Sequence, residues 1–295
     1  MQYYYTLADI CIRLASPFPV LENESTKEFF SEKPPNASPD LEILYRPSET
    51  LPEPRDIRYT EARRIYTGQG EGAATFFSGT PFVPPYAWVP RDTLGEGRLI
   101  CRYLPGSERL MNYARNALTL MDLESTLLHF GAVILHASFI RWNGQGVIFS
   151  APSGTGKSTQ AELWRQYAGA EILNGDRAAI RQRDGAWHGY GLPYAGTSGI
   201  YRNERAPLRA VVALRQSAEN SVRRLSPSQA FRYLYPETMI HRWDPDYEQR
   251  ATELLLGIFG EIPVYLLSCR PDREAVELLK NEIETQENTY DPDAR

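Results

Sequence analysis

A single nine-residue segment constrains the fold of this chain more than any other feature of its sequence. Residues 151–159 read APSGTGKST, which has the spacing of a Walker A phosphate-binding loop with Ala151 in the place of the usual first glycine. Residue frequencies alone predict such a motif about 0.02 times in a chain of this length. The motif lies between an apolar strand pattern at residues 146–150 and a helical pattern at residues 157–167. The sequence therefore predicts an α/β domain in which strand, loop and helix follow one another.

The residue types in this loop suit the binding of phosphate and Mg²⁺. Gly154 and Gly156 allow backbone angles that turn successive amides inward, and the start of the following helix adds its positive dipole end. Lys157 is expected to reach the β and γ phosphates, and Ser158 to place its hydroxyl on Mg²⁺. Thr159, one position further along the helix, is less suited to the metal. The predicted nucleotide contacts are Ser153, Gly154, Thr155, Gly156, Lys157, Ser158 and Thr159.

A second ligand for Mg²⁺ is predicted at Asp176. A loop of this kind usually needs an acidic partner at the end of a neighbouring strand. Asp176 follows the apolar pair at residues 172–173 and lies 19 positions after Lys157, where a strand can return beside the first one. The alternative is that Asp176 only shapes a turn with Gly175.

The rest of the chain predicts two domains and a tail. Residues 1–110 predict a mostly antiparallel β domain, with strands at 10–14, 57–66, 73–77 and 98–103, and a proline-rich loop at 33–56. Residues 111–286 predict the α/β domain, entered through one helix at 111–130. Residues 287–295 predict a disordered tail.

Three local signals predict boundaries inside the second domain. Asn143-Gly144 and Asp184-Gly185 are dipeptides that favour tight hairpin turns. Ser226, followed by proline and by Gln229 three residues later, has the pattern of a helix start.

Charge and hydropathy limit the classes of partner. The net charge of −5 gives no general attraction to nucleic acid, so none is expected as a partner. No segment approaches the roughly 18 apolar residues of a membrane span, and the first 20 residues lack the pattern of a signal peptide. We expect a cytoplasmic protein without a membrane partner, and a homo-oligomer is left open.

Several motifs together resemble the kinase domain of the bacterial HPr kinase/phosphorylase family. The resemblance is closest to HPr-kinase-like proteins encoded in peptide-modification gene clusters, and it covers roughly residues 135–214. The motifs are His136-Ala137-Ser138, the strand at 146–150 with the loop after it, Asn174-Gly175-Asp176 and Gly191-Leu192-Pro193.

The resemblance implies a compact P-loop kinase fold of the HPr kinase and phosphoenolpyruvate carboxykinase type. It implies an ATP-dependent kinase that transfers the γ-phosphoryl group to a hydroxyl, with a serine of a peptide or protein as the favoured acceptor. It also places His136 on the strand facing the γ-phosphate, and the alternative is that His136 is a partly buried histidine with a structural role only. The implied catalytic residues are His136, Lys157 and Asp176. The amino-terminal part does not resemble that of HPr kinase.

One departure from the family pattern leaves the activity open. The family usually has two adjacent aspartates after the strand; the second resembles Asp176, whereas the first, the base for the acceptor hydroxyl, falls on Gly175. Glycine cannot accept a proton, and general base catalysis typically contributes about 10²- to 10⁴-fold. The alternative to a kinase is therefore a catalytically weak or inactive nucleotide-binding regulatory or scaffold protein.

Overall fold

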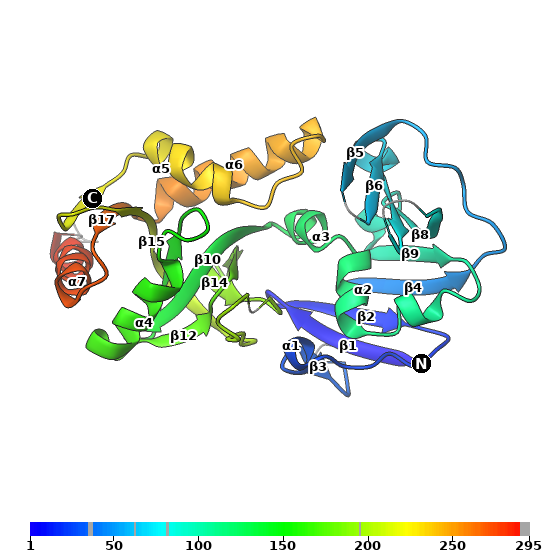
Figure 1. Cartoon of the computed structure of the whole chain (residues 1–295), viewed down its shortest axis with the longest axis horizontal. Helices are drawn as coiled ribbons and strands as arrows, with labels where there is room; N and C mark the ends of the chain where they lie inside the picture. Colours follow the sequence, from blue (N-terminus) through cyan, green and yellow to red (C-terminus); the bar gives the residue numbers. More distant parts are fainter. Residues whose placement is uncertain (35–37, 62, 81–82, 195, 290–295) are drawn as a thin grey trace. The chain divides into compact units, whose positions relative to one another are not determined.

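The chain divides into two compact units (Figure 1). The computed structural model describes residues 1–34, 38–61, 63–80, 83–194 and 196–289. The first unit consists of Met1–Gly131 and Ile240–Ala251, and the second of Ala132–Met239 and Thr252–Arg295. This division differs from the boundary predicted after residue 110, because the helical segment before Gly131 and a later return of the chain both belong to the first unit.

The first unit is built on a nine-stranded sheet with the order β3-β1-β2-β4-β9-β8-β7-β6-β5. Most neighbouring strands are antiparallel, as the sequence predicted, but β4 runs parallel to both β2 and β9. The strands are β1 (Gln2–Leu7), β2 (Ile10–Ala15), β3 (Phe30–Ser31), β4 (Leu41–Pro47), β5 (Ile57–Glu61), β6 (Arg64–Thr67), β7 (Ala74–Ser78), β8 (Pro85–Pro90) and β9 (Arg98–Tyr103). The helices are α1 (Glu24–Lys27), α2 (Ala114–Leu120) and α3 (Leu123–His129), with 3₁₀ turns at Gly70–Gly72, Leu94–Glu96 and Glu108–Leu110.

Three predictions for this unit were wrong. The single strand predicted at residues 57–66 is a hairpin of two strands, β5 and β6, that pair antiparallel. Strand β4 lies inside the predicted proline-rich loop, because Leu41, Ile43 and Tyr45 alternate toward the core and outweigh the prolines around them. The single helix predicted over residues 111–130 is two helices, since Asp122 between α2 and α3 has a φ of +49° that no α-helix contains.

A buried polar cluster surrounds Asp122, which is 2% exposed. Asp122 forms an ion pair with Arg91, and both of its carboxylate oxygens lie 2.9 Å from Nε2 of His241. Burial, and then the charge of Arg91, lower the pKa of His241 to about 4. Neutral His241 therefore donates its Nε2 proton to Asp122. Asp122, Glu124 and His241 form a trio whose side-chain atoms have the spacing of metal ligands. The charge of Asp122 is already neutralised by Arg91, which makes the trio less suited to a metal ion.

The second unit contains an eight-stranded mixed sheet with the order β11-β10-β13-β14-β15-β17-β16, in which β12 also pairs with β10 and β11 with β15. Strands β11, β15 and β17 are parallel neighbours, so their carboxyl ends meet at one edge. The strands are β10 (Ala132–Trp142), β11 (Gln145–Ser150), β12 (Glu171–Asn174), β13 (Arg177–Arg183), β14 (Ala186–Gly191), β15 (Arg205–Gln216), β16 (Ser221–Arg224) and β17 (Val264–Cys269).

Helices cover this sheet and bury a common core. They are α4 (Lys157–Ala168), α5 (Pro227–Leu234), a 3₁₀ turn η4 (Tyr235–Glu237), α6 (Pro245–Glu261), which begins in the return segment of the first unit, and α7 (Arg273–Thr289). The predicted helix start at Ser226 is confirmed by reciprocal capping bonds with Gln229. Residues 287–289 are helical rather than part of a disordered tail, and residues 290–295 lie outside the described residues. None of the described helices is long and apolar enough to cross a membrane.

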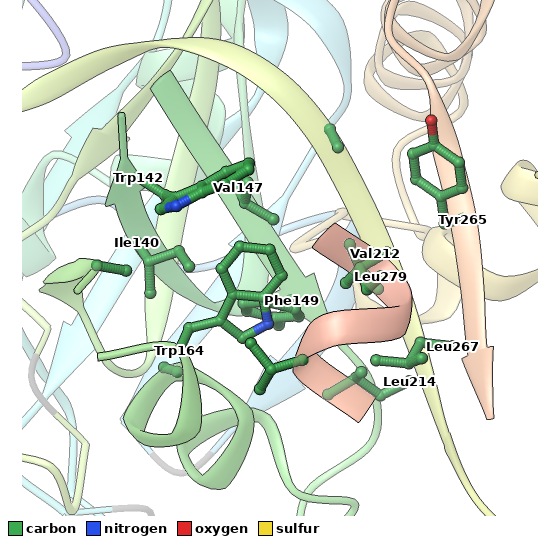
Figure 2. Packing of buried hydrophobic residues seen from close by; sticks show 14 of the residues in the cluster. Ile140, Trp142, Val147, Phe149, Trp164, Val212, Leu214, Tyr265, Leu267 and Leu279 are labelled. Atoms are coloured by element: carbon green, nitrogen blue, oxygen red, sulfur yellow. The ribbon is translucent and has the colours of Figure 1, made fainter. Parts of the chain in front are cut away.

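The core under α4 is centred on Trp164, which is fully buried (Figure 2). Its ring centroid lies 5.2 Å from that of Trp142 and 5.9 Å from that of Phe149. Leu279 of α7 and Val212 of β15 belong to the same cluster. This packing fixes α4, and with it the loop that precedes α4, to the end of β11.

Candidate functional site

The glycine-rich loop joins the end of β11 to the start of α4, as the sequence predicted. Gly154 has a φ of +80° and Gly156 a φ of +116°, which are backbone angles that side chains disfavour. No other atom lies within 4 Å of an ideal Cβ at either position, so the glycines serve the backbone angle rather than a lack of space. The first amides of α4 have no intrahelical carbonyl, so they offer donors to an anion.

Lys157, the first residue of α4, is a buried cation with 7% exposure. Its Nζ donates hydrogen bonds to the carbonyl oxygens of Ala151 at 2.7 Å and Pro152 at 3.3 Å. Burial lowers the pKa of Lys157, and the nearby carboxylates of Glu237 and Asp176 act in the opposite direction. A buried ammonium whose hydrogen bonds go to neutral carbonyls fits an added anion, because a phosphate oxygen is a stronger acceptor.

A cavity of about 380 Å³ opens beside the loop where β15 and β17 end. Nε2 of Gln216, the last residue of β15, lies 3.3 Å from the carbonyl oxygen of Gly154 and 3.4 Å from that of Thr155. Gln160 of α4 also lines the cavity, and its Nε2 donates to Sγ of Cys269 at 3.2 Å. Its Oε1 is buried and accepts no hydrogen bond from the described residues. The unsatisfied acceptor thus lies behind the cavity wall rather than in its opening.

Asp176 is held in place by the residue two positions before it. Oδ1 of the fully buried Asn174 accepts the amides of Asp176 at 2.8 Å and Arg177 at 2.9 Å, while its Nδ2 donates to the carbonyl of Leu192 at 2.7 Å. The Asp176 side chain is 28% exposed and lies close enough to Lys157 to influence its pKa. The turn is thus formed by Asn174, while Oδ2 of the Asp176 carboxylate lies 3.6 Å from Nε of Arg177 in a partly exposed ion pair.

His136 lies on β10 beside this turn, since it pairs in register with Arg177. Its Nδ1 is 3.2 Å from Oε2 of Glu237, a residue of η4 whose side chain is only 12% exposed. Glu237 was not found from the sequence: it lies 101 positions from His136 and belongs to no motif. Because Glu237 contacts His136 and influences Lys157, it links the predicted histidine to the loop.

A second cavity, of about 590 Å³, shares the loop residues Gly154 and Thr155 with the first. Its other walls include Arg232 and Tyr233 of α5 and Glu237. The structure thus brings His136, Lys157 and Asp176 into one region with Glu237. The predicted contacts Ser153, Ser158 and Thr159 are exposed at the same loop.

Fold and site define a mixed α/β protein in which a glycine-rich loop and a buried lysine lie where parallel strands end. The sequence model of the family described as "SynChlorMet cassette protein ScmC" matches residues 99–270. Since this is more than half of the chain, the protein belongs to that family.

Two further comparisons give little. No curated protein matches the sequence. A solved structure, that of the Hpr(Ser) kinase/phosphatase from Coxiella burnetii, is similar with a TM-score of 0.33 and 13% identity over 53% of this chain and 93% of that one.

Proposed function

We propose that the second unit binds Mg·ATP at the loop of residues 151–159 and transfers the γ-phosphoryl group to a hydroxyl. The observation that carries the proposal is the buried Lys157 ammonium inside an open glycine-rich loop, with the Asp176 carboxylate close by. A serine of a peptide or protein is the favoured acceptor, which rests on the sequence resemblance described above. Gly175 favours the alternative, a nucleotide-binding regulatory protein, because it leaves one family carboxylate absent.

The residues around the loop suit each part of the nucleotide. Loop amides and Lys157 would hold the phosphates, while Ser158 and Asp176 supply the oxygen ligands that Mg²⁺ prefers. Bound Mg²⁺ would neutralise charge on the phosphates. The 380 Å³ cavity lies where ligands bind in open α/β sheets, at the carboxyl ends of parallel strands.

The His136–Glu237 pair supplies a base where Gly175 cannot. With the Nδ1 proton donated to Glu237, Nε2 of His136 is free of a proton and can accept the one that leaves the acceptor hydroxyl. The hydroxyl oxygen then bonds to the γ-phosphorus as the bond to the β–γ bridging oxygen breaks, and ADP leaves. Glu237 orients the imidazole and stabilises its charged form.

Binding of Mg·ATP tests the first half of the proposal. At about 100 times the dissociation constant, a ligand of the native state adds about 2.7 kcal/mol, or about 5–10 °C in melting temperature for a unit of this size. Lys157→Ala is expected to remove most of that shift. Lys27→Ala, a substitution of an exposed lysine in the first unit, serves as the matched control and should leave it unchanged. Absence of binding to the unmodified protein at millimolar Mg·ATP in calorimetry would refute the proposal.

A further inference from the structure

Strand β5 of the first unit forms an open edge of its sheet. It is the last strand in the order and pairs only with β6 among the described residues (Figure 1). Its side chains are mostly exposed, including Ile57 at 56% and Tyr59 at 47%. An edge that shows unpaired backbone groups and apolar side chains is a template for an added strand.

A cavity of about 570 Å³ lies at the end of this edge. Glu61, the last residue of β5, lines it together with Arg63 and Arg64 at the start of β6. The buried side chain of Phe77 forms an apolar part of the lining, and Tyr113, which is 42% exposed, also lines the cavity. The strand edge and the cavity are therefore continuous along the chain.

The cavity is rich in arginine although the whole chain carries a net charge of −5. Arg64 is paired with Glu61 and neutralises the one acidic side chain of the described lining. Arg63, Arg109 and Arg115 form no ion pair with a described carboxylate, so three positive charges face an apolar and aromatic cavity. Guanidinium groups in such a setting match carboxylates, which they bind through two parallel hydrogen bonds.

We propose that this edge and cavity form a docking site for an acidic, extended peptide segment. The peptide would add a strand along the five residues of β5, about 17 Å, and place acidic side chains near the unpaired arginines. A second copy of this chain fits less well, because the acidic residues at its own β5, Asp56 and Glu61, are already paired with Arg58 and Arg64. The site lies in the first unit and does not depend on nucleotide binding or phosphoryl transfer.

The test measures peptide binding by fluorescence polarisation, with the unmodified full chain and no nucleotide. The probes are two labelled pools of random nonapeptides, one with three adjacent glutamates fixed at either end and one with glutamines instead. We expect the glutamate pool to bind at least about tenfold more tightly. Hydrogen exchange with the bound glutamate pool should slow at the β5 amides.

The variant Arg63→Glu with Arg109→Glu should lose that preference, whereas Arg46→Glu, at an exposed arginine on β4, should retain it. Thermal unfolding checks that the variants fold, and Arg115→Gln provides a milder second test with a several-fold loss. Equal binding of the two pools, or an unchanged preference in the double variant, would overturn the proposal. So would sedimentation showing a dimer whose β5 amides are already protected without peptide.

Discussion

Replacing Glu237 by glutamine removes the carboxylate that contacts His136 while keeping the shape of the side chain. Oε2 of Glu237 lies 3.2 Å from Nδ1 of His136, and the Glu237 side chain is 12% exposed. Water therefore has little access to this site and cannot easily replace the carboxylate as the partner of His136. Glutamine cannot stabilise a positive imidazole. If the pair is the base for phosphoryl transfer, the rate should fall by the amount that general base catalysis contributes, about 10²- to 10⁴-fold, or about 2.7–5.5 kcal/mol in the barrier.

The same reasoning predicts a rescue at the position where the family pattern is broken. Gly175 is not among the residues with positive φ, so its backbone angle does not require glycine. The backbone N–H of Gly175 donates a hydrogen bond to the carbonyl oxygen of Ile200 at 3.2 Å. This bond does not involve a side chain, so the substitution keeps it. We expect Gly175→Asp to restore transfer at least tenfold in the Glu237→Gln background and to change it little in the unmodified protein.

The assay is transfer of labelled γ-phosphate from ATP to peptides and to water, with nucleotide affinity measured beside it. Affinity should not weaken in Glu237→Gln, because the loss of a carboxylate near the phosphates lowers repulsion. His136→Ala should cost as much as Glu237→Gln, and the double variant no more, since the two residues act as a unit. Measurable transfer that is unchanged in Glu237→Gln would refute the role of the pair.

Three further outcomes follow from the structure. Asp176→Asn should weaken Mg²⁺-dependent nucleotide binding more than Mg²⁺-independent binding; equal losses in calorimetry would assign Asp176 to structure alone. Trp164→Ala should lower the free energy of unfolding by about 3–5 kcal/mol in chemical denaturation, and a loss below about 1 kcal/mol would contradict the packing around it. The pKa of His241 in the folded chain is about 4, below its ordinary 6.5, so the unfolded chain binds the proton first as the pH falls. His241 therefore contributes stability above pH 6.5 that is lost as the pH falls toward 4. That loss is about 3 kcal/mol, and His241→Gln should flatten the pH dependence; equal slopes would refute the shift.

Local sequence signals predicted much of the second unit. Asn143 and Gly144 both have positive φ, and so do Asp184 and Gly185, which is why these dipeptides located two hairpin turns. The helix start at Ser226 followed from side-chain bonds within four residues. Such signals depend only on neighbours along the chain, so they can be recognised in the sequence without knowledge of the fold.

The features that were missed depend on contacts between distant segments. Strand β4 is paired with β2 and β9, which are remote in sequence, and its prolines lie outside or at the end of the pairing. Glu237 gains its place from a 3₁₀ turn packed beside β10, and nothing in its own sequence surroundings marks it. The break at Asp122 follows from its ion pair and hydrogen bonds, since the apolar helical pattern continues through it.

The turn at Asn174 places a charged residue by means of an uncharged one. Its three hydrogen bonds join an amide side chain to backbone groups, and Asn174 is fully buried. Neither acid nor high ionic strength weakens such bonds as it weakens ion pairs. The backbone position of Asp176 should therefore be the same in salt washes and mild acid as at neutral pH. If Mg²⁺ binds as proposed, its loss under those conditions would report protonation or screening of the Asp176 carboxylate itself. Returning to the original buffer should then restore binding without any refolding step.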